Sequence, residues 1–228
     1  MKIGRIDYIN LLPFDVFIKK QPLMNASKKF MECRKSYPSR LNQEFKRRRI
    51  EASFISAIAG KGKKVTKAGI VARGSVLSVI AIPDEEGKDY QSATSNALLE
   101  VLGVKGRVLI GDRALQYYSQ GKEHIDLGEE WFKRHRLPFV FGRFCYNARA
   151  SLYEMLANRF VQKPIKIPFY ILDKYARERS VSRDLIKRYL KNHIFYKVDK
   201  KECLSLNKFY FEERMSCLYK ISKSKKFK

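Results

Sequence analysis

Small polar residues follow several apolar segments of this chain at the points where a sheet would end its strands. In order they are Asn10, Ser56, Ser75, Ser78, Gly111 and Asp112. In open α/β sheets the ligand crevice lies beyond the carboxyl ends of the strands. We therefore expect these positions to meet in one cavity, as in a site for a small ligand.

Two hydroxyl residues, Thr94 and Ser95, precede an apolar segment typical of a helix. The first amides of a helix lack intrahelical partners and carry a partial positive charge, which favours an anionic ligand. Simpler roles stay open, because Ser and Asn are common turn formers and Thr94 or Ser95 is a normal helix cap. Asp112 beside Arg113 is also consistent with a plain ion pair. The residues alone thus predict an anion site and leave catalysis open.

No motif for a metal, a cofactor or a nucleophilic enzyme is visible in the sequence. Patterns such as GxGxxG, the P-loop, GxSxG and HExxH are missing. The four cysteines show no CxxC spacing, and we expect them to be buried, reduced thiols. The three histidines lie in charged stretches, where we expect surface positions. We therefore predict that no metal or cofactor is used.

The composition predicts a soluble globular protein with a strong positive charge. The chain has 228 residues, 45% of them hydrophobic, and a formal net charge of +25. Such a charge favours polyanions, yet no nucleic-acid-binding module is recognisable. We expect a small acidic ligand and no nucleic acid. No apolar run is long enough to span a membrane, and Asp7 and Pro13 interrupt any signal-peptide pattern, which predicts a cytoplasmic protein with no membrane association.

Strand and helix patterns alternate along the chain, which is typical of an α/β fold. Expected strands cover residues 2–10, 52–56, 108–110 and 137–147, together with two extended pieces separated at Gly74. Expected helices cover residues 39–49 with Ser39 as cap, a segment from about 94 to 103, residues 126–136, and a helical tail over the last eighty residues in which Ser182 is a cap. The pattern restarts after Pro83, which indicates a second unit.

Taken together, six stretches make the chain similar to the chorismate dehydratase family of the futalosine route to menaquinone. They are "GRIDYINLLP" at 4–13, "FISAIA" at 54–59, "VLSV" at 76–79, "TSNALL" at 94–99, "IGDRAL" at 110–115 and "DLGEEWFKRHRLPFVF" at 126–141. They occur in the family order and cover residues 1 to about 145. The resemblance implies a two-lobed fold like that of type II periplasmic binding proteins, with the substrate in a cleft between the lobes. By analogy, residues 1–82 and 145–228 would form lobe one and residues 83–144 lobe two.

The same resemblance implies a reaction and assigns residues to it. Chorismate would lose water to give 3-(1-carboxyvinyloxy)benzoate, a hydro-lyase reaction in which aromatisation drives the step and no cofactor takes part. Asn10 matches the strand-end amide of the family and Ser78 the serine of its "SV" motif, and on this resemblance we expect both to contact and position the substrate in catalysis. Ser56, Ser75, Thr94, Ser95, Gly111 and Asp112 would complete the substrate-binding set.

The chain also departs from the family pattern. The segment before "IGDRAL" is short, Ala57 stands where a second serine is common, and "GRFCY" replaces a stretch that commonly holds a tryptophan. Other functions stay open, and one of them, an RNA- or DNA-binding protein, rests only on the net charge of +25. The sister enzyme dihydroxynaphthoate synthase would need a histidine base in the cleft, and no histidine follows a strand here. A non-enzymatic cytoplasmic binding protein for a small carboxylate is a further alternative.

Overall fold

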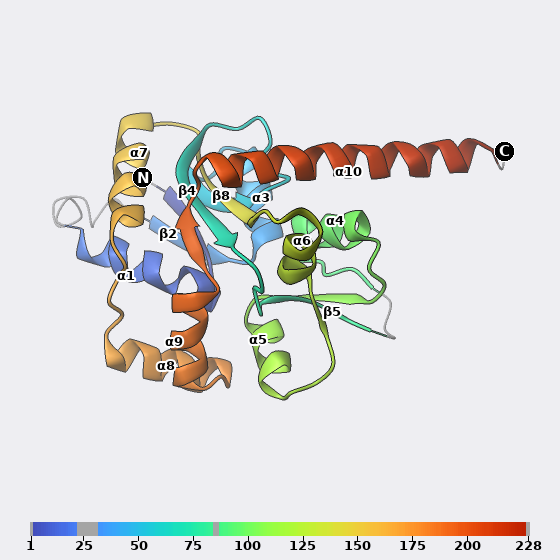
Figure 1. The fold of residues 1–228 in the computed structure, drawn as a ribbon. Coiled ribbons are helices and arrows are strands. Elements are labelled where there is room, and N and C mark those ends of the chain that lie inside the picture. The colour runs from blue at the N-terminus through green and yellow to red at the C-terminus, as the bar shows by residue number, and fades with distance from the viewer. Residues whose placement is uncertain (1, 22–31, 84–86, 227–228) are drawn as a thin grey trace.

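Two β-sheets build the two lobes of the protein (Figure 1). The computed structural model describes residues 2–21, 32–83 and 87–226. The larger sheet has the strand order β2-β1-β3-β8-β4-β9, with β1 Lys2–Ile6, β2 Glu32–Ser36, β3 Ala52–Ser56, β4 Val65–Ala72, β8 Phe139–Tyr146 and β9 Phe195–Lys197. Strand β1 is parallel to β2 and β3, whereas β8 is antiparallel to β3 and β4. The first lobe is thus a mixed sheet, which its helices cover.

The second lobe is smaller and carries an antiparallel sheet with the order β6-β5-β7. Its strands are β5 Val79–Ile82, β6 Arg107–Ile110 and β7 Ile125–Asp126, and its helices are α4 Ala93–Leu102, α5 Gly111–Ser119 and α6 Leu127–His135. The buried core residues Leu98, Leu115 and Trp131 come from these three helices. This lobe therefore packs its own apolar layer.

The chain crosses between the sheets twice, once between β4 and β5 and once between α6 and β8. Strand β5 pairs with β6 and β7, so residues 79–82 lie in the small sheet and not in the first lobe as we expected. Strand β8 pairs with β3 and β4, so residues 139–144 lie in the large sheet. We therefore propose lobe boundaries close to Gly74 and to residues 136–138, in place of 82 and 144.

The first strand is shorter than its apolar sequence suggests. Strand β1 ends at Ile6, a 3-10 turn follows at Ile9–Leu11, and Pro13 lies in the first turn of α1, Leu12–Lys20. Proline is tolerated there because the first helical amides have no intrahelical acceptor. The two charged residues of this opening segment have partners from other elements, since Arg5 pairs with Asp15 at 2.8 Å and Asp7 pairs with Lys35 and Arg179.

Several helix ends also differ from expectation. Helix α3, Pro38–Lys46, has Tyr37 as its cap residue instead of Ser39, and α4 begins after Ser92, whose hydroxyl accepts from the Ser95 amide. Gly111 starts α5 directly and forms no separate turn. Helix α1 was not anticipated, whereas α7 (Ala150–Gln162), α8 (Phe169–Arg179) and α9 (Arg183–Asn192) lie within the expected helical tail.

The C-terminal part completes the first lobe and also reaches the second. Strand β9 interrupts the expected helical tail and joins the edge of the large sheet beside β4. Helix α10, Lys200–Lys226, then packs on β8 of lobe one and on α4 of lobe two, and its far end projects beyond the body of the molecule (Figure 1). The indole of Trp131 in α6 donates to Ser205 in α10 at 3.0 Å. One helix therefore spans the region where the two lobes join.

Two groups of side chains are placed differently from the sequence expectation. Cys145 is buried, but Cys203 and Cys217 are exposed on α10, and the Cys33 side chain lies outside those described. His135 is buried against the ring of Trp131, with ring centroids 4.1 Å apart, and is not at the surface. No helix in the described ranges has both the length and the apolar character to cross a membrane.

Candidate active site

A small cavity lies between the lobes and collects most of the predicted site residues. Asn10, Ser56, Ser78, Ser95 and Gly111 all line it, together with Tyr8 and Ser92. Apolar walls surround these groups, formed by Ile6, Ile55, Ile70, Val76, Val79, Ile110 and Phe141. Asn10 lies in the 3-10 turn after β1 and Ser56 at the end of β3, both in lobe one, whereas Ser78 directly precedes β5, and Ser95 and Gly111 lie in the first turns of α4 and α5 in lobe two. The structure thus brings five of the predicted residues together in one cavity.

Three serines on the cavity wall are each held by a donor behind them. Ser56 Oγ accepts from the Asn42 amide at 2.9 Å, and Ser78 Oγ accepts from the Tyr189 hydroxyl at 2.7 Å. Ser95 Oγ accepts from the Ser92 hydroxyl at 2.8 Å. Because a lone pair of each oxygen is already used, each hydroxyl proton can point elsewhere. The cavity therefore presents three oriented O–H donors, which suit carboxylate oxygens.

Asn10 is the one side chain of the set with an unused polar atom. It is 9% exposed, and its Oδ1 has no hydrogen-bond partner among the described residues. The backbone around it is fixed, because the hydroxyl of Tyr196 in β9 donates to the Asn10 carbonyl. A buried amide without a partner is uncommon in folded proteins. Asn10 is therefore placed to contact a ligand with its side-chain amide.

Two helix N-termini of the second lobe also meet the cavity. Helix α4 presents Ser95 in its first turn, and α5 begins at Gly111. Gly111 has a φ of +63°, and a Cβ there would come within 2.8 Å of the Tyr8 ring, so only glycine fits. The amides and dipoles at these helix ends favour negative charge without placing a cation in the cavity.

The backbone is strained at Leu77, the residue directly before Ser78. Leu77 adopts a φ of +58°, which is uncommon for a residue with a branched side chain. The carboxylate of Asp126 holds this turn, since it accepts from the amides of Val76 and Leu77 and also caps α6 through Gly128. Burial raises the pKa of Asp126, although those amides oppose the shift. The turn that presents Ser78 is thus fixed by one buried carboxylate.

Two predicted residues, Thr94 and Ser75, do not line the cavity and instead join the elements around it. Thr94 is fully buried, and its hydroxyl accepts from the Ile58 amide of lobe one at 3.1 Å. Ser75 lies at the crossover, with its hydroxyl 3.0 Å from Nδ1 of His193. Neither is positioned in this structure to meet a ligand in the cavity, so their assignment to substrate binding stays a prediction.

Asp112 links the lobes. Its Oδ1 accepts from the Ile9 amide at 2.8 Å, and its Oδ2 lies 3.2 Å from Nε of Arg179. The expected pair with Arg113 is wrong, because Arg113 contacts Asp89 at 2.6 Å. Burial raises the pKa of Asp112 to about 6, against the lowering effects of the Ile9 amide and Arg179. Asp112 therefore acts as a contact between the lobes.

Tyr8 is the single titratable side chain among the described residues that line the cavity. Its hydroxyl donates to Gln91, and burial raises the pKa of the phenol. A phenol with a raised pKa is a poor base at neutral pH. No described residue that lines the closed cavity is therefore an effective base at neutral pH.

The sequence reasoning missed the residues that hold the site in place. Asn42, Ser92, Tyr189 and Tyr196 all come from elements that are distant from the strand ends. Tyr8 lies within "GRIDYIN" and could have been noticed as the aromatic residue next to the strand-end amide. Ser92 could have been noticed as a helix cap three positions before Ser95. Asn42, Tyr189 and Tyr196 carry no local signal, because their contacts form with segments farther along the chain.

The lobes are closed around the cavity. Its volume is about 40 Å³, whereas pockets for organic ligands begin at roughly 300 Å³. Contacts such as Ile9 to Asp112 and Ile58 to Thr94 join the two sides. A substrate of chorismate size therefore requires the lobes to separate and the side chains to rearrange.

Comparisons with known proteins identify the family. Residues 90–213 match the family model described as menaquinone biosynthesis. A chorismate dehydratase from Campylobacter jejuni is 42% identical over 213 residues, which is 92% of this chain and 96% of the relative. The chain belongs to the menaquinone-biosynthesis family.

Solved structures show the fold of this family member. A protein from Archaeoglobus fulgidus matches with a TM-score of 0.66 at 17% identity, covering 95% of this chain and 97% of that one. The periplasmic aliphatic sulphonate-binding protein of Escherichia coli matches with a TM-score of 0.52 at 11% identity, covering 98% and 92%. The predicted two-lobed, periplasmic-binding-protein-like α/β fold is thereby confirmed.

Proposed function

We propose that this protein is a chorismate dehydratase, which removes water from chorismate to give 3-(1-carboxyvinyloxy)benzoate. The observation that carries the proposal is the cavity with three oriented serine hydroxyls and the unpartnered amide of Asn10. Chorismate has two carboxylates, which can accept from the serine hydroxyls, and a hydroxyl, which can donate to Oδ1 of Asn10. The family membership and the chorismate dehydratase relative support the same substrate.

The reaction needs orientation and desolvation more than acid or base groups of the protein. The proton leaves the ring carbon that bears the ether, the neighbouring hydroxyl leaves, and the ring becomes aromatic. Ser78 and Ser56 would hold carboxylate oxygens as neutral donors, and Asn10 would contact the substrate hydroxyl or a carboxylate. Donors fixed in advance lose little free energy to reorganisation during the reaction.

We propose that a carboxylate of the substrate accepts the ring proton. Among the described residues around the cavity, none is Asp, Glu, His, Lys or Arg. The apolar walls, including Ile55 and Phe141, would exclude water from the closed site and strengthen the hydrogen bonds within it. We also propose a cytoplasmic setting, in keeping with a biosynthetic family.

A direct assay tests the proposal. Purified protein is incubated with chorismate without any added cofactor, and the product is followed by its aromatic absorbance and by its mass, lighter by one water. We expect Asn10→Ala and Ser78→Ala to lose most of the activity. Ser119→Ala, which changes an exposed serine on α5, is the matched control and should keep it. Full turnover in both cavity variants contradicts the site assignment.

The same experiment separates the alternatives. Chorismate that binds in calorimetry and is recovered unchanged would indicate a binding protein. A dihydroxynaphthoate synthase would leave chorismate untouched, and none of the described residues that line the cavity is a histidine that could serve as its base.

A further inference from the structure

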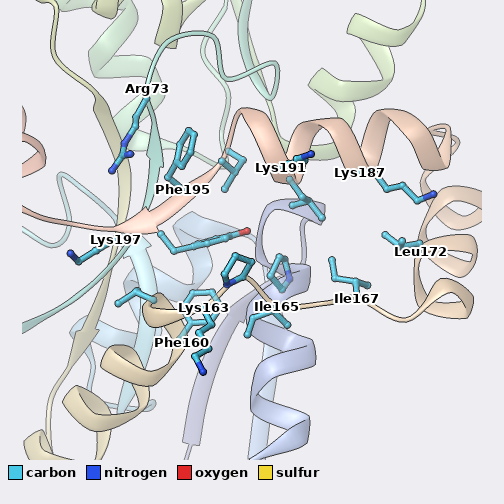
Figure 2. A pocket seen from close by; sticks show the side chains of 16 residues that line it. Arg73, Phe160, Lys163, Ile165, Ile167, Leu172, Lys187, Lys191, Phe195 and Lys197 are labelled. Carbon is cyan, nitrogen blue, oxygen red and sulfur yellow. The ribbon is translucent and has the colours of Figure 1, made fainter.

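A second, much larger cavity lies in the first lobe, away from the cleft. Its volume is about 660 Å³, within the range of pockets for organic ligands. It is formed by the end of α7, the linker 163–168, α9 and β9 (Figure 2). None of the serines that line the cleft contributes to it. It is therefore a separate site, and the dehydratase reaction does not account for it.

The middle of this cavity is apolar. Phe160, Leu172 and Ile194 are buried beneath it, and Ile165, Ile167 and Leu190 are half-buried on its wall. A half-buried aliphatic side chain at a cavity still has surface that a ligand can cover. Removing such surface from water is favourable in proportion to the area covered. The cavity thus suits a ligand with a sizeable apolar body.

The edge of the cavity is cationic. Figure 2 shows Lys187 and Lys191 along α9 on one side, and Arg73 with Lys197 on the other. Lys163 completes the set, and no acidic residue is among the described residues of the lining. Such an edge attracts an anionic group, and a carboxylate can accept hydrogen bonds from several ammonium groups at once.

The lysines differ in how far they are already neutralised. Lys197 pairs with Asp199 at 2.8 Å, and Lys187 lies 3.8 Å from the highly exposed Asp184. Lys163 and Lys191 form no ion pair with any described residue. Lys191 and the weakly paired Lys187, four residues apart on α9, are therefore available to one anionic head group.

We propose that this cavity binds a single-chain anionic amphiphile, an aliphatic chain that ends in a carboxylate. The chain would lie against Ile165, Ile167 and Leu190, and the carboxylate would meet Lys187 and Lys191. The apolar middle selects for the chain, and the cationic edge selects for the sign of the head group.

The test uses dodecanoate, below its micelle concentration, with the full-length protein in calorimetry. We expect one molecule to bind, and the affinity to rise about fourfold for each methylene from octanoate to dodecanoate. Dodecyltrimethylammonium, with the same chain and the opposite charge, should bind at least tenfold more weakly. Equal binding of the two amphiphiles, or no binding of dodecanoate, overturns the proposal.

Variants locate the binding. Lys187→Gln with Lys191→Gln should weaken dodecanoate about tenfold at low salt, and less so at high salt. The matched control, Lys105→Gln with Lys122→Gln, makes the same charge change on exposed lysines of the second lobe and should leave binding unchanged. An equal loss in the control pair contradicts the assignment.

Two further arms complete the design. Leu190→Trp fills the cavity and should abolish binding, while an unchanged far-ultraviolet spectrum shows that the variant is folded. Sedimentation with phosphatidylglycerol vesicles distinguishes a free ligand from a membrane surface. We expect the protein to stay in the supernatant, and co-sedimentation that depends on Lys187 and Lys191 would overturn the free-ligand proposal.

Discussion

The buried hydroxyl of Tyr189 should affect the reaction through Ser78 alone. It donates to Ser78 Oγ at 2.7 Å, and Tyr189 is fully buried, so no solvent molecule at the surface replaces it. Tyr189→Phe removes one oxygen atom and leaves the ring packing in place. Ser78 then loses the donor that directs its own proton toward the cavity.

The magnitude follows from the kinds of hydrogen bond involved. A neutral hydrogen bond contributes about 1 kcal/mol, so Tyr189→Phe should lower kcat/KM about fivefold. Ser78→Ala removes a donor to a charged carboxylate, worth roughly 1.5–3 kcal/mol, which corresponds to about 10- to 150-fold. The larger effect therefore belongs to the residue that contacts the substrate.

A double-mutant cycle on the dehydration of chorismate tests this reasoning. If Tyr189 acts only by positioning Ser78, Tyr189→Phe has no further effect once Ser78 is alanine. A fivefold loss in both backgrounds refutes the reasoning, because it shows that Tyr189 acts independently of Ser78.

A matched control addresses stability. Tyr153 is also fully buried, and its hydroxyl donates to Glu51 at 3.2 Å, while neither residue lines the cleft. Tyr153→Phe removes a donor to a carboxylate, so it should lower the free energy of unfolding by roughly 1.5–3 kcal/mol and leave kcat/KM unchanged.

Three further outcomes are expected. Gly111→Ala places a Cβ within 2.8 Å of the Tyr8 ring at positive φ, which should cost about 2 kcal/mol and lower the melting temperature by roughly 4–8 °C; calorimetry that shows no shift contradicts the packing argument. Asn42→Ala removes both contacts to Ser56, one to its amide and one to its hydroxyl, and should raise KM for chorismate about tenfold; steady-state kinetics measure it, and an unchanged KM excludes Ser56 as a donor. Burial raises the pKa of Asp112 to about 6 in the folded state. The folded protein therefore binds the proton of this carboxyl more tightly than the unfolded chain does. The resulting stabilisation of the folded state is present below pH 4 and is lost as the pH rises through 6. Urea unfolding should show that Asp112→Asn removes about 2 kcal/mol of this decline between pH 4.5 and 7; an identical decline in both proteins contradicts the shift.

The strand ends could be predicted because they depend on local signals. Apolar, β-branched runs such as 108–110 favour strands, and the small polar residue that follows each run is visible in the sequence. Those signals pointed to Asn10, Ser56, Ser78 and Gly111, and the helix-start signal pointed to Ser95; all five line the cleft. Helix ends were less certain, since α4 starts one residue earlier than expected and is capped by Ser92.

The lobe boundaries could not be read from local patterns. The segment 79–82 has the same apolar character as a strand of the large sheet, and only its pairing with β6 and β7 assigns it to the small one. Likewise, Thr94 and Asp112 look like site residues in the sequence, but both are occupied by contacts with the opposite lobe. Pairing between distant segments decides such questions, and it leaves no local trace.

By itself, then, the sequence determined the α/β character, the order of the elements and the set of small donors that could meet an anion. The tertiary structure decided which of those donors share a cavity and how each is oriented. Asn42, Tyr189 and Tyr196 hold Ser56, Ser78 and Asn10 from elements that lie up to 186 positions away along the chain. A hydroxyl becomes a directed donor only when a partner occupies its lone pair, and folding alone brings those partners together.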